Sequence, residues 1–350
     1  LLPSSMLCKP VRKFIYILLV LFSSLSCQND GAYFGPVYTE TDTVGNLNLE
    51  KSIIIGCEGN FQYSNASLSI IDLDRSEVQN NLYRNANNRA LGDVLQSIQL
   101  QGDSLFVVMN NSGSIKILNS KTFEEIDSFD GFVSPRHLQF VGNDEFYVTD
   151  LYSNNLIRFN YRTKQIVSEI ETEGWQEEMI LSDDQLYISN IEKERIDVIN
   201  LSSNSIVDSI MLSFKPTFIR KLSESLIVVA GIDINEQAHL AKISLVSHKV
   251  DEYEMSTSLV GFDVYNDEIY WCNRKSILKI DLENSISVKV LDFSITTPYN
   301  FRIQASEGYC VITDARDYIS NGSVSVYKLS GQKIGQFEVG IIPQALCFAF

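Results

Sequence analysis

The sequence predicts an all-β protein, a seven-bladed β-propeller with four-stranded blades in which the C-terminal strand completes the first blade. Three observations lead to this fold: a continuous pattern of short strands, a repeat of about 40 residues, and repeat units that are incomplete at both ends of the chain.

The strand pattern begins at residue 51. Short runs rich in Val, Ile, Phe and Tyr alternate with polar turns, and no stretch keeps a 3.6-residue apolar period. Hydrophobic residues make up 45% of the 350 residues, which is enough for a core of ordinary size. The residues from 51 to 350 are therefore expected to form one all-β domain.

The repeat is marked by the first apolar residue after a polar hairpin turn. These residues are Leu105, Phe146, Leu186, Leu226, Ile269 and Tyr309, at successive separations of 41, 40, 40, 43 and 40. A second hairpin recurs seven times, at 72–77, 119–123, 160–164, 200–204, 244–248, 281–285 and 328–332. This period is typical of propeller blades, because one small sheet buries both faces only when its neighbours stack against it.

The two chain ends indicate how the ring closes. Residues 343–350 resemble the strand that opens another unit at 135–140, but the chain then stops. The first unit instead begins at 52–57 with what would be a second strand. We therefore expect 343–350 to pair beside 52–57, so that no open edge separates the first and last blades.

The N-terminal segment has the pattern of an export signal. Basic residues Lys9, Arg12 and Lys13 precede the apolar run 14–22, which is shorter than the roughly 20 residues of a membrane-spanning helix. We predict a signal peptide over 1–26. Its start is expected at Met6, with residues 1–5 lying upstream of the true start.

Cys27 follows small residues and is the predicted lipid attachment point, with 27–50 as the tether to the propeller. Ser24 stands where such signals usually carry an aliphatic residue, so an ordinary cleaved signal with a nearby cysteine is the alternative. The expected location is the outer-membrane surface, with the membrane contacted through the lipid only.

Charge and cysteine placement exclude some functions. The net charge is −16, and removal of 1–26 would make it more negative, which argues against a nucleic-acid partner. Cys57, Cys272, Cys310 and Cys347 lie in apolar, strand-like stretches and are expected as buried thiols. No cysteine or histidine spacing predicts a metal site, and no cofactor is expected.

The binding face is predicted from loop lengths. In each blade the loop after the second strand and the loop to the next blade emerge on one face, and these loops are polar and unequal in length. The candidate ligand-binding residues are Asn60, Phe61, Tyr63, Asn111, Arg136, Asp150, Tyr152, Trp175, Glu177, Asn190, Asn273, Asn300, Asp314 and Tyr318. Aromatic rings with amides suit a large, uncharged ligand such as a corrinoid. The alternative is that many of these polar residues only shape turns.

Four candidates, Arg136, Asp150, Glu177 and Asp314, are expected near the central channel. Their oxygen atoms could hold a calcium ion, but Arg136 could instead neutralise a carboxylate in a structural ion pair, which we favour. No nucleophile motif or phosphate-binding glycine loop is present in the sequence, so we do not expect an enzyme.

Several of these segments resemble the YncE-like propeller lipoproteins of Bacteroidetes. The similar motifs are 58–61, 65–69, 110–112, 134–138, 149–154, 174–179 and 313–327. That family includes a surface vitamin B12-binding lipoprotein that caps a TonB-dependent transporter. The resemblance implies a cell-surface protein that captures a nutrient, for example a corrinoid such as vitamin B12, for such a transporter. It does not identify the nutrient.

Two other functions stay open: a lactonase-type hydrolase with a metal in the channel, and a propeller that only joins other proteins. A ring of oxygen ligands in the channel would favour the first, and a rimmed apolar patch without a pocket would favour the second.

Overall fold

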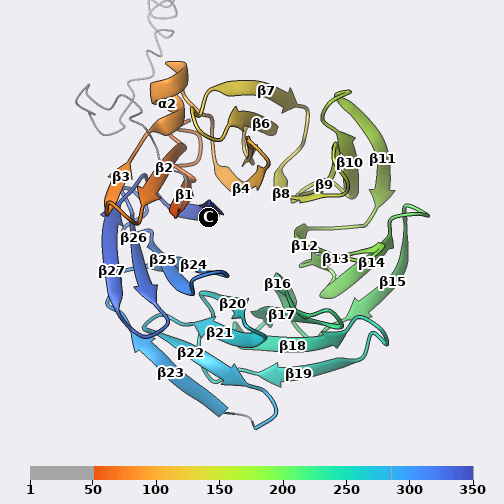
Figure 1. Cartoon of the computed structure of the whole chain (residues 1–350). Coiled ribbons are helices and arrows are strands. Elements are labelled where there is room, and N and C mark those ends of the chain that lie inside the picture. The colour runs from red at the N-terminus through yellow and green to blue at the C-terminus, as the bar shows by residue number, and fades with distance from the viewer. Residues whose placement is uncertain (1–50, 285, 350) are drawn as a thin grey trace, which may run out of the picture. The chain divides into compact units, whose positions relative to one another are not determined.

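A computed structural model describes residues 51–284 and 286–349 as a ring of seven four-stranded antiparallel sheets (Figure 1). The predicted seven-bladed β-propeller is thus confirmed. Residues 1–50 lie outside the described residues, so the signal peptide, the lipid site at Cys27 and the tether stay predictions. Within the described part, no helix has the length and apolarity needed to cross a membrane.

Each blade has an inner strand against the channel and three strands outside it. Blade 1 contains β28 (Pro343–Ala349), β1 (Ser52–Cys57), β2 (Ser67–Asp72) and β3 (Glu77–Gln79). Blade 2 contains β4 (Leu95–Gln101), β5 (Ser104–Met109), β6 (Ser114–Asn119) and β7 (Glu125–Asp130). Blade 3 contains β8 (Pro135–Phe140), β9 (Glu145–Asp150), β10 (Asn155–Asn160) and β11 (Gln165–Glu171). Blade 4 contains β12 (Gln176–Ser182), β13 (Gln185–Asn190), β14 (Arg195–Asn200) and β15 (Ser205–Met211).

The remaining blades follow the same order from the channel outward. Blade 5 contains β16 (Lys215–Ser223), β17 (Leu226–Ile232), β18 (Ala238–Ser244) and β19 (Val250–Glu254). Blade 6 contains β20 (Gly261–Tyr265), β21 (Glu268–Cys272), β22 (Ser276–Asp281) and β23 (Ile286–Asp292). Blade 7 contains β24 (Pro298–Gln304), β25 (Tyr309–Asp314), β26 (Ser323–Lys328) and β27 (Lys333–Glu338).

The ring closes as the chain ends predict. Strand β28 pairs with β1 in antiparallel register, with Ser52 opposite Ala349 and Ile54 opposite Cys347. The last strand therefore becomes the inner strand of blade 1, and β1 gains the partner that its own repeat unit lacks. Closure gives β1 a hydrogen-bonded strand on each side, β28 and β2, so β1 is not left as an open edge.

The hydrophobic core lies between the blades. Each of seven main apolar clusters combines side chains from two neighbouring blades. The cluster that closes the ring packs Ile53 and Ile71 of blade 1 against Val311, Val326 and Phe337 of blade 7. Each blade therefore buries its two faces only when its neighbours in the ring pack against them.

Two smaller features complete the fold. Helix α2 (Leu82–Asn87) connects blades 1 and 2 and buries Leu82 and Tyr83; the sequence did not predict it, because six residues are too few to show a helical period. The four cysteines of the described part are free thiols; Cys57, Cys272 and Cys310 are buried as expected, whereas Cys347 is only partly buried. Burial raises the pKa of Cys57 to about 12.

Inner strands carry an irregularity that matters for the site. In every blade except blade 6 the inner strand has a register shift near its first residues, where extra residues interrupt the pairing with the second strand. Such β-bulges re-aim side chains that regular pairing would direct elsewhere. The residues in these bulges include Gln96, Arg136, Glu177, Asn300 and Gln344.

Candidate functional site

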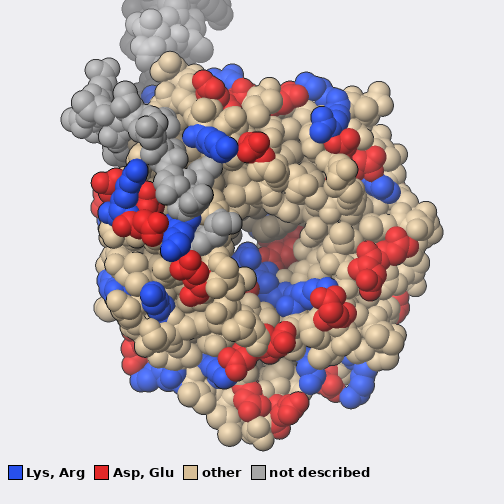
Figure 2. Space-filling model, viewed as in Figure 1, with Lys and Arg blue, Asp and Glu red and all other residues tan. Residues whose placement is uncertain are grey.

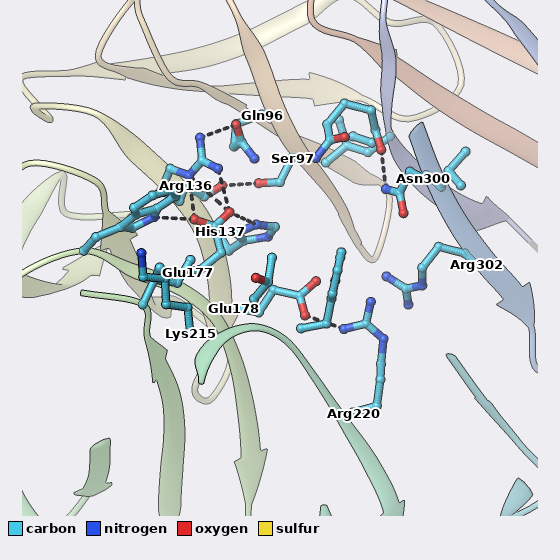
Figure 3. Close-up of a pocket in the computed structure, with 18 of the residues that line it drawn as sticks. Gln96, Ser97, Arg136, His137, Glu177, Glu178, Lys215, Arg220, Asn300 and Arg302 are labelled. Atoms are coloured by element: carbon cyan, nitrogen blue, oxygen red, sulfur yellow. Dashed lines mark hydrogen bonds and ion pairs between the residues drawn. The ribbon is translucent and has the colours of Figure 1, made fainter. Parts of the chain in front are cut away.

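A cavity of about 410 Å³ lies at the channel end where the inner strands begin. Inner-strand residues of blades 1, 2, 3, 4, 5 and 7 line it, together with Trp175, Ile191 and Ile232 from the adjoining loops and strand end (Figure 3). Because the inner strands begin on the face that carries the variable loops, the cavity opens on the face that the sequence favours for binding.

On one side of the cavity, Arg136 and Glu177 form a two-point ion pair. Arg136 Nη2 donates to Glu177 Oε1 over 2.7 Å and Nε donates to Oε2 over 2.9 Å, while Nη1 donates to Gln96 over 2.6 Å. This is the structural ion pair favoured for Arg136 from the sequence. Burial alone would raise the pKa of Glu177, but Arg136 and His137 outweigh it and lower the pKa to about 2.

The Trp175 indole is held by the same pair. Its Nε1–H donates to Glu177 Oε2 over 2.6 Å, and the Arg136 guanidinium carbon lies 5.8 Å from the ring centroid. Both contacts restrict the rotation of the indole. The ring thus forms a preorganised flat wall of the cavity.

A second charged group lies toward blades 5, 6 and 7. Arg220 contacts Glu178 at 2.5 Å and Asp263 at 3.4 Å, and Arg302 Nε donates to the other oxygen of Asp263 over 2.9 Å. Burial by itself would lower the pKa of Arg220, but the charges of Glu178 and Asp263 outweigh this effect. The pKa of Arg220 is therefore raised, and the side chain stays cationic. The guanidinium groups of Arg220 and Arg302 therefore share the Asp263 carboxylate beside the cavity.

Buried hydroxyl groups at the ends of the second strands support the bulges. Thr149 Oγ1 accepts from His137 N over 3.0 Å, and Thr313 Oγ1 accepts from Asn300 N over 2.8 Å. Ser189 Oγ accepts from Glu178 N over 2.9 Å in the same way. These bonds satisfy backbone groups that the bulges remove from the strand ladder.

Glu58 lies in the loop after β1, and its carboxylate accepts a 2.8 Å hydrogen bond from the Tyr299 hydroxyl. Burial raises the pKa of Glu58 to about 7, although Tyr299 and the Arg136 charge act in the opposite direction. Tyr299 in turn packs edge-on against Tyr318, with ring centroids 5.9 Å apart. The Glu58 carboxyl group thus has a pKa close to neutrality.

The structure brings four of the candidate residues from the sequence together at the cavity: Arg136, Trp175, Glu177 and Asn300. The Asn300 side-chain nitrogen donates to the Gln344 carbonyl over 2.5 Å, and its side-chain oxygen accepts from the backbone N–H of Phe301. It joins the inner strands of blades 7 and 1.

Four further candidates direct their side chains to loop backbones. Asp150 accepts from the backbone N–H groups of Ser134, Tyr152 and Ser153. Asp314 accepts from those of Thr296, Thr297 and Arg316, and Asn190 and Asn273 shape their loops in a similar way. Asp150 and Asp314 are buried and are not in the cavity wall, so the expectation that they project toward the channel does not match their geometry.

The other six candidates lie in loops outside the cavity wall. The side chains of Phe61, Tyr63, Tyr152 and Tyr318 are exposed to solvent; the exposed fraction is 75% for Tyr152 and 44% for Tyr318. The Asn60 amide donates to the Tyr318 carbonyl over 2.7 Å, which joins the loops of blades 1 and 7. Asn111 donates to Asp93 at 2.5 Å.

Six titratable residues of the site were not among the candidates predicted from the sequence: His137, Glu178, Lys215, Arg220, Asp263 and Arg302. All lie on inner strands, where polar residues interrupt an apolar pattern. Alignment of the seven inner strands by their repeat position could have found them. Among residues 51–284 and 286–349, no group of three or more His, Cys, Asp or Glu side chains is arranged to hold a metal ion.

The fold and the cavity define this protein as a seven-bladed propeller with a polar pocket at one end of its channel. The chain belongs to the family described as "Domain of unknown function (DUF5074)", whose model matches residues 51–309. Among proteins of curated function, none matches the chain.

Similar solved structures share the fold at low identity. A quinonprotein alcohol dehydrogenase-like protein from Bacteroides thetaiotaomicron is 13% identical, with a TM-score of 0.69 over 87% of this chain and 80% of that one. A candidate 6-phosphogluconolactonase from Bacteroides fragilis is 12% identical, with a TM-score of 0.64 over 88% of this chain and 99% of that one. The dihydro-heme d1 dehydrogenase NirN is 12% identical, with a TM-score of 0.59 over 91% and 78%. At these identities the likeness shows the fold alone.

Proposed function

We propose that this protein is a binding protein that captures a small organic molecule at the mouth of its channel. The observation that carries the proposal is the cavity of about 410 Å³, which combines a fixed aromatic wall with charged side chains from blades 3, 4, 5 and 7. Ligand pockets typically have volumes of about 300–1,000 Å³ and a few well-placed polar groups. The ion pairs hold these groups in place before a ligand arrives, which lowers the entropic cost of binding.

The proposal also covers where the protein acts and which partner receives the ligand. The protein is anchored by lipid at Cys27 on the outer-membrane surface and hands a nutrient to a TonB-dependent transporter. The N-terminal signal pattern and the resemblance to YncE-like lipoproteins support this setting. A corrinoid would extend beyond the cavity onto the exposed rings of Phe61, Tyr152 and Tyr318.

A second candidate function is hydrolysis within the cavity. One observation favours it: His137 Nε2 lies 3.3 Å from Glu177 Oε1, so an imidazole and a carboxylate face the same space. Turnover of a lactone by the purified protein, lost in His137→Gln, would replace the binding proposal with this one.

Tryptophan fluorescence tests the binding proposal directly. The protein has two tryptophans, and Trp271 is fully buried in the core, so a ligand-dependent change reports Trp175. Cobalamin, haem, a siderophore and an oligosaccharide would each be titrated into the purified protein. We expect a saturable change with at least one of them.

Lys164→Ala provides the control, because Lys164 lies in the hairpin between β10 and β11 on the opposite face and forms an ion pair with Asp127. The proposal fails if no ligand gives a saturable change, or if Lys164→Ala weakens binding as much as Trp175→Ala does.

A further inference from the structure

The cavity wall is richer in cations than the rest of the chain. Four cationic side chains, Arg136, Lys215, Arg220 and Arg302, line it against two carboxylates, Glu177 and Glu178. The whole chain, by contrast, has a net charge of −16. Figure 2 shows Lys and Arg side chains along the central opening. The channel therefore concentrates positive charge within an acidic protein.

Most of this positive charge is neutralised within the protein. Arg136 pairs with Glu177, and Arg220 and Arg302 share Glu178 and Asp263. Lys215 is the exception, because its ammonium group has no carboxylate within 4.0 Å among the described residues. Among the described residues, the cavity thus keeps one positive charge, that of Lys215, without an ion-pair partner.

Arg302 supplies hydrogen-bond donors to the same space. Its Nε binds Asp263 at 2.9 Å, but neither of its two terminal nitrogens has an acceptor among residues 51–284 and 286–349. The side chain is 36% exposed, and Figure 3 shows its guanidinium group directed into the cavity. A planar guanidinium with two free N–H edges suits a carboxylate or a phosphate oxygen pair.

Apolar surface lies close to these cations. Trp175, Phe218, Ile191 and Ile232 belong to the same cavity wall. An unpaired cation next to apolar surface is costly unless an anion balances it. The combination suits a molecule with an apolar body and an anionic group.

We infer that the ligand of this cavity is an organic anion, whose carboxylate or phosphate group binds Arg302 while Lys215 balances its charge and its apolar body packs on Trp175 and Phe218. This inference rests on the proposed function and names the chemical class of the ligand. Arg136 and Arg220 hold the carboxylates that would otherwise repel the anion.

Three matched probes test the inference by calorimetry on the purified protein: 2-naphthoate, 2-naphthyl phosphate and the uncharged naphthalene-2-carboxamide. We expect at least one acid to bind about tenfold more tightly than the carboxamide, the effect of one or two hydrogen bonds to a charged group. The order of the two acids then tells whether the site prefers carboxylate or phosphate.

Two variants identify the groups involved. Lys215→Gln removes the unpaired charge without breaking an ion pair, and it should weaken acid binding about tenfold while leaving carboxamide binding within about twofold. Lys221→Gln is the matched control, since Lys221 lies on the same strand, pairs with Glu224 and is not in the cavity wall. It should leave both affinities unchanged. Arg302→Gln should likewise weaken acid binding about tenfold and leave carboxamide binding within about twofold.

The outcomes separate the two proposals. Equal binding of acids and carboxamide, or equal effects of Lys215→Gln and Lys221→Gln, would overturn the inference and leave the binding function intact. Failure of these probes together with failure of the nutrient ligands would overturn both.

Discussion

The Thr149 hydroxyl in blade 3 donates a 2.7 Å hydrogen bond to the backbone carbonyl of Glu177 in blade 4, and the same oxygen accepts from His137 N over 3.0 Å. Thr149 is fully buried. One hydroxyl thereby supports two neighbouring bulges whose side chains, His137 and Glu177, line the cavity. The precision of the site depends on such buried bonds between blades.

Thr149→Val should therefore destabilise the protein and loosen the site. The change keeps the shape of the side chain but leaves one buried N–H and one buried C=O without this partner, at a cost of about 3 kcal/mol in the free energy of unfolding. Denaturant unfolding would measure the loss. Thr122→Val, in an exposed hairpin turn, should change stability by less than about 0.5 kcal/mol. Equal stability of the two variants would contradict the supporting role of Thr149.

Trp175→Ala should weaken ligand binding about thirtyfold, because truncation of a buried aromatic contact commonly costs about 2 kcal/mol. Tyr152→Ala should change affinity less than about threefold by the same principle, because its ring is 75% exposed and lies outside the cavity wall. Calorimetry with the ligand found by fluorescence would compare them. A larger effect of Tyr152→Ala would move the site from the cavity to the surrounding loops.

Glu58 should make stability depend on pH near neutrality. Its pKa is raised from the ordinary value of 4.5 to about 7 in the fold, so the folded protein holds a proton there that the unfolded chain releases. This contribution is fully present below about pH 4.5 and is lost as the pH rises through about 7, amounting to about 3 kcal/mol.

Glu58→Gln keeps a neutral side chain that can accept the Tyr299 hydroxyl. Unfolding measured at pH 5 and pH 8 should show a smaller loss of stability for this variant than for the native protein. Glu224→Gln, at an almost fully exposed position, is the control and should keep the native pH dependence. The prediction is wrong if Glu58→Gln loses as much stability as the native protein over this interval.

Cys27→Ser should release the protein from the membrane if Cys27 carries a lipid. A single thiol is the attachment point in this prediction, and without acyl chains the apolar run 14–22 is too short to serve as a membrane-spanning helix. Fractionation of cells that express each form would measure the change. Unchanged membrane retention of Cys27→Ser would contradict lipid anchoring there.

The sequence by itself determined the architecture. A repeat near 40 residues, the recurring second hairpin and the truncated first unit were sufficient to predict seven blades and the pairing of 343–350 with 52–57. These features are local, since strand period and turn chemistry act over a few residues. The sequence also indicated which face bears the variable loops, because strand order alone sets that face.

Only the tertiary structure decided which side chains form the cavity. The pairing partner of each inner strand creates the bulges that turn Arg136, Glu177 and Asn300 toward the channel, and a one-residue change of register would send them elsewhere. Asp150 and Asp314 are residue types found in binding sites, yet their oxygens accept hydrogen bonds from backbone N–H groups of their own loop and of the loop that enters the same blade. Lys215 and Arg302 come together with Trp175 only because the ring brings blades 4, 5 and 7 to one channel.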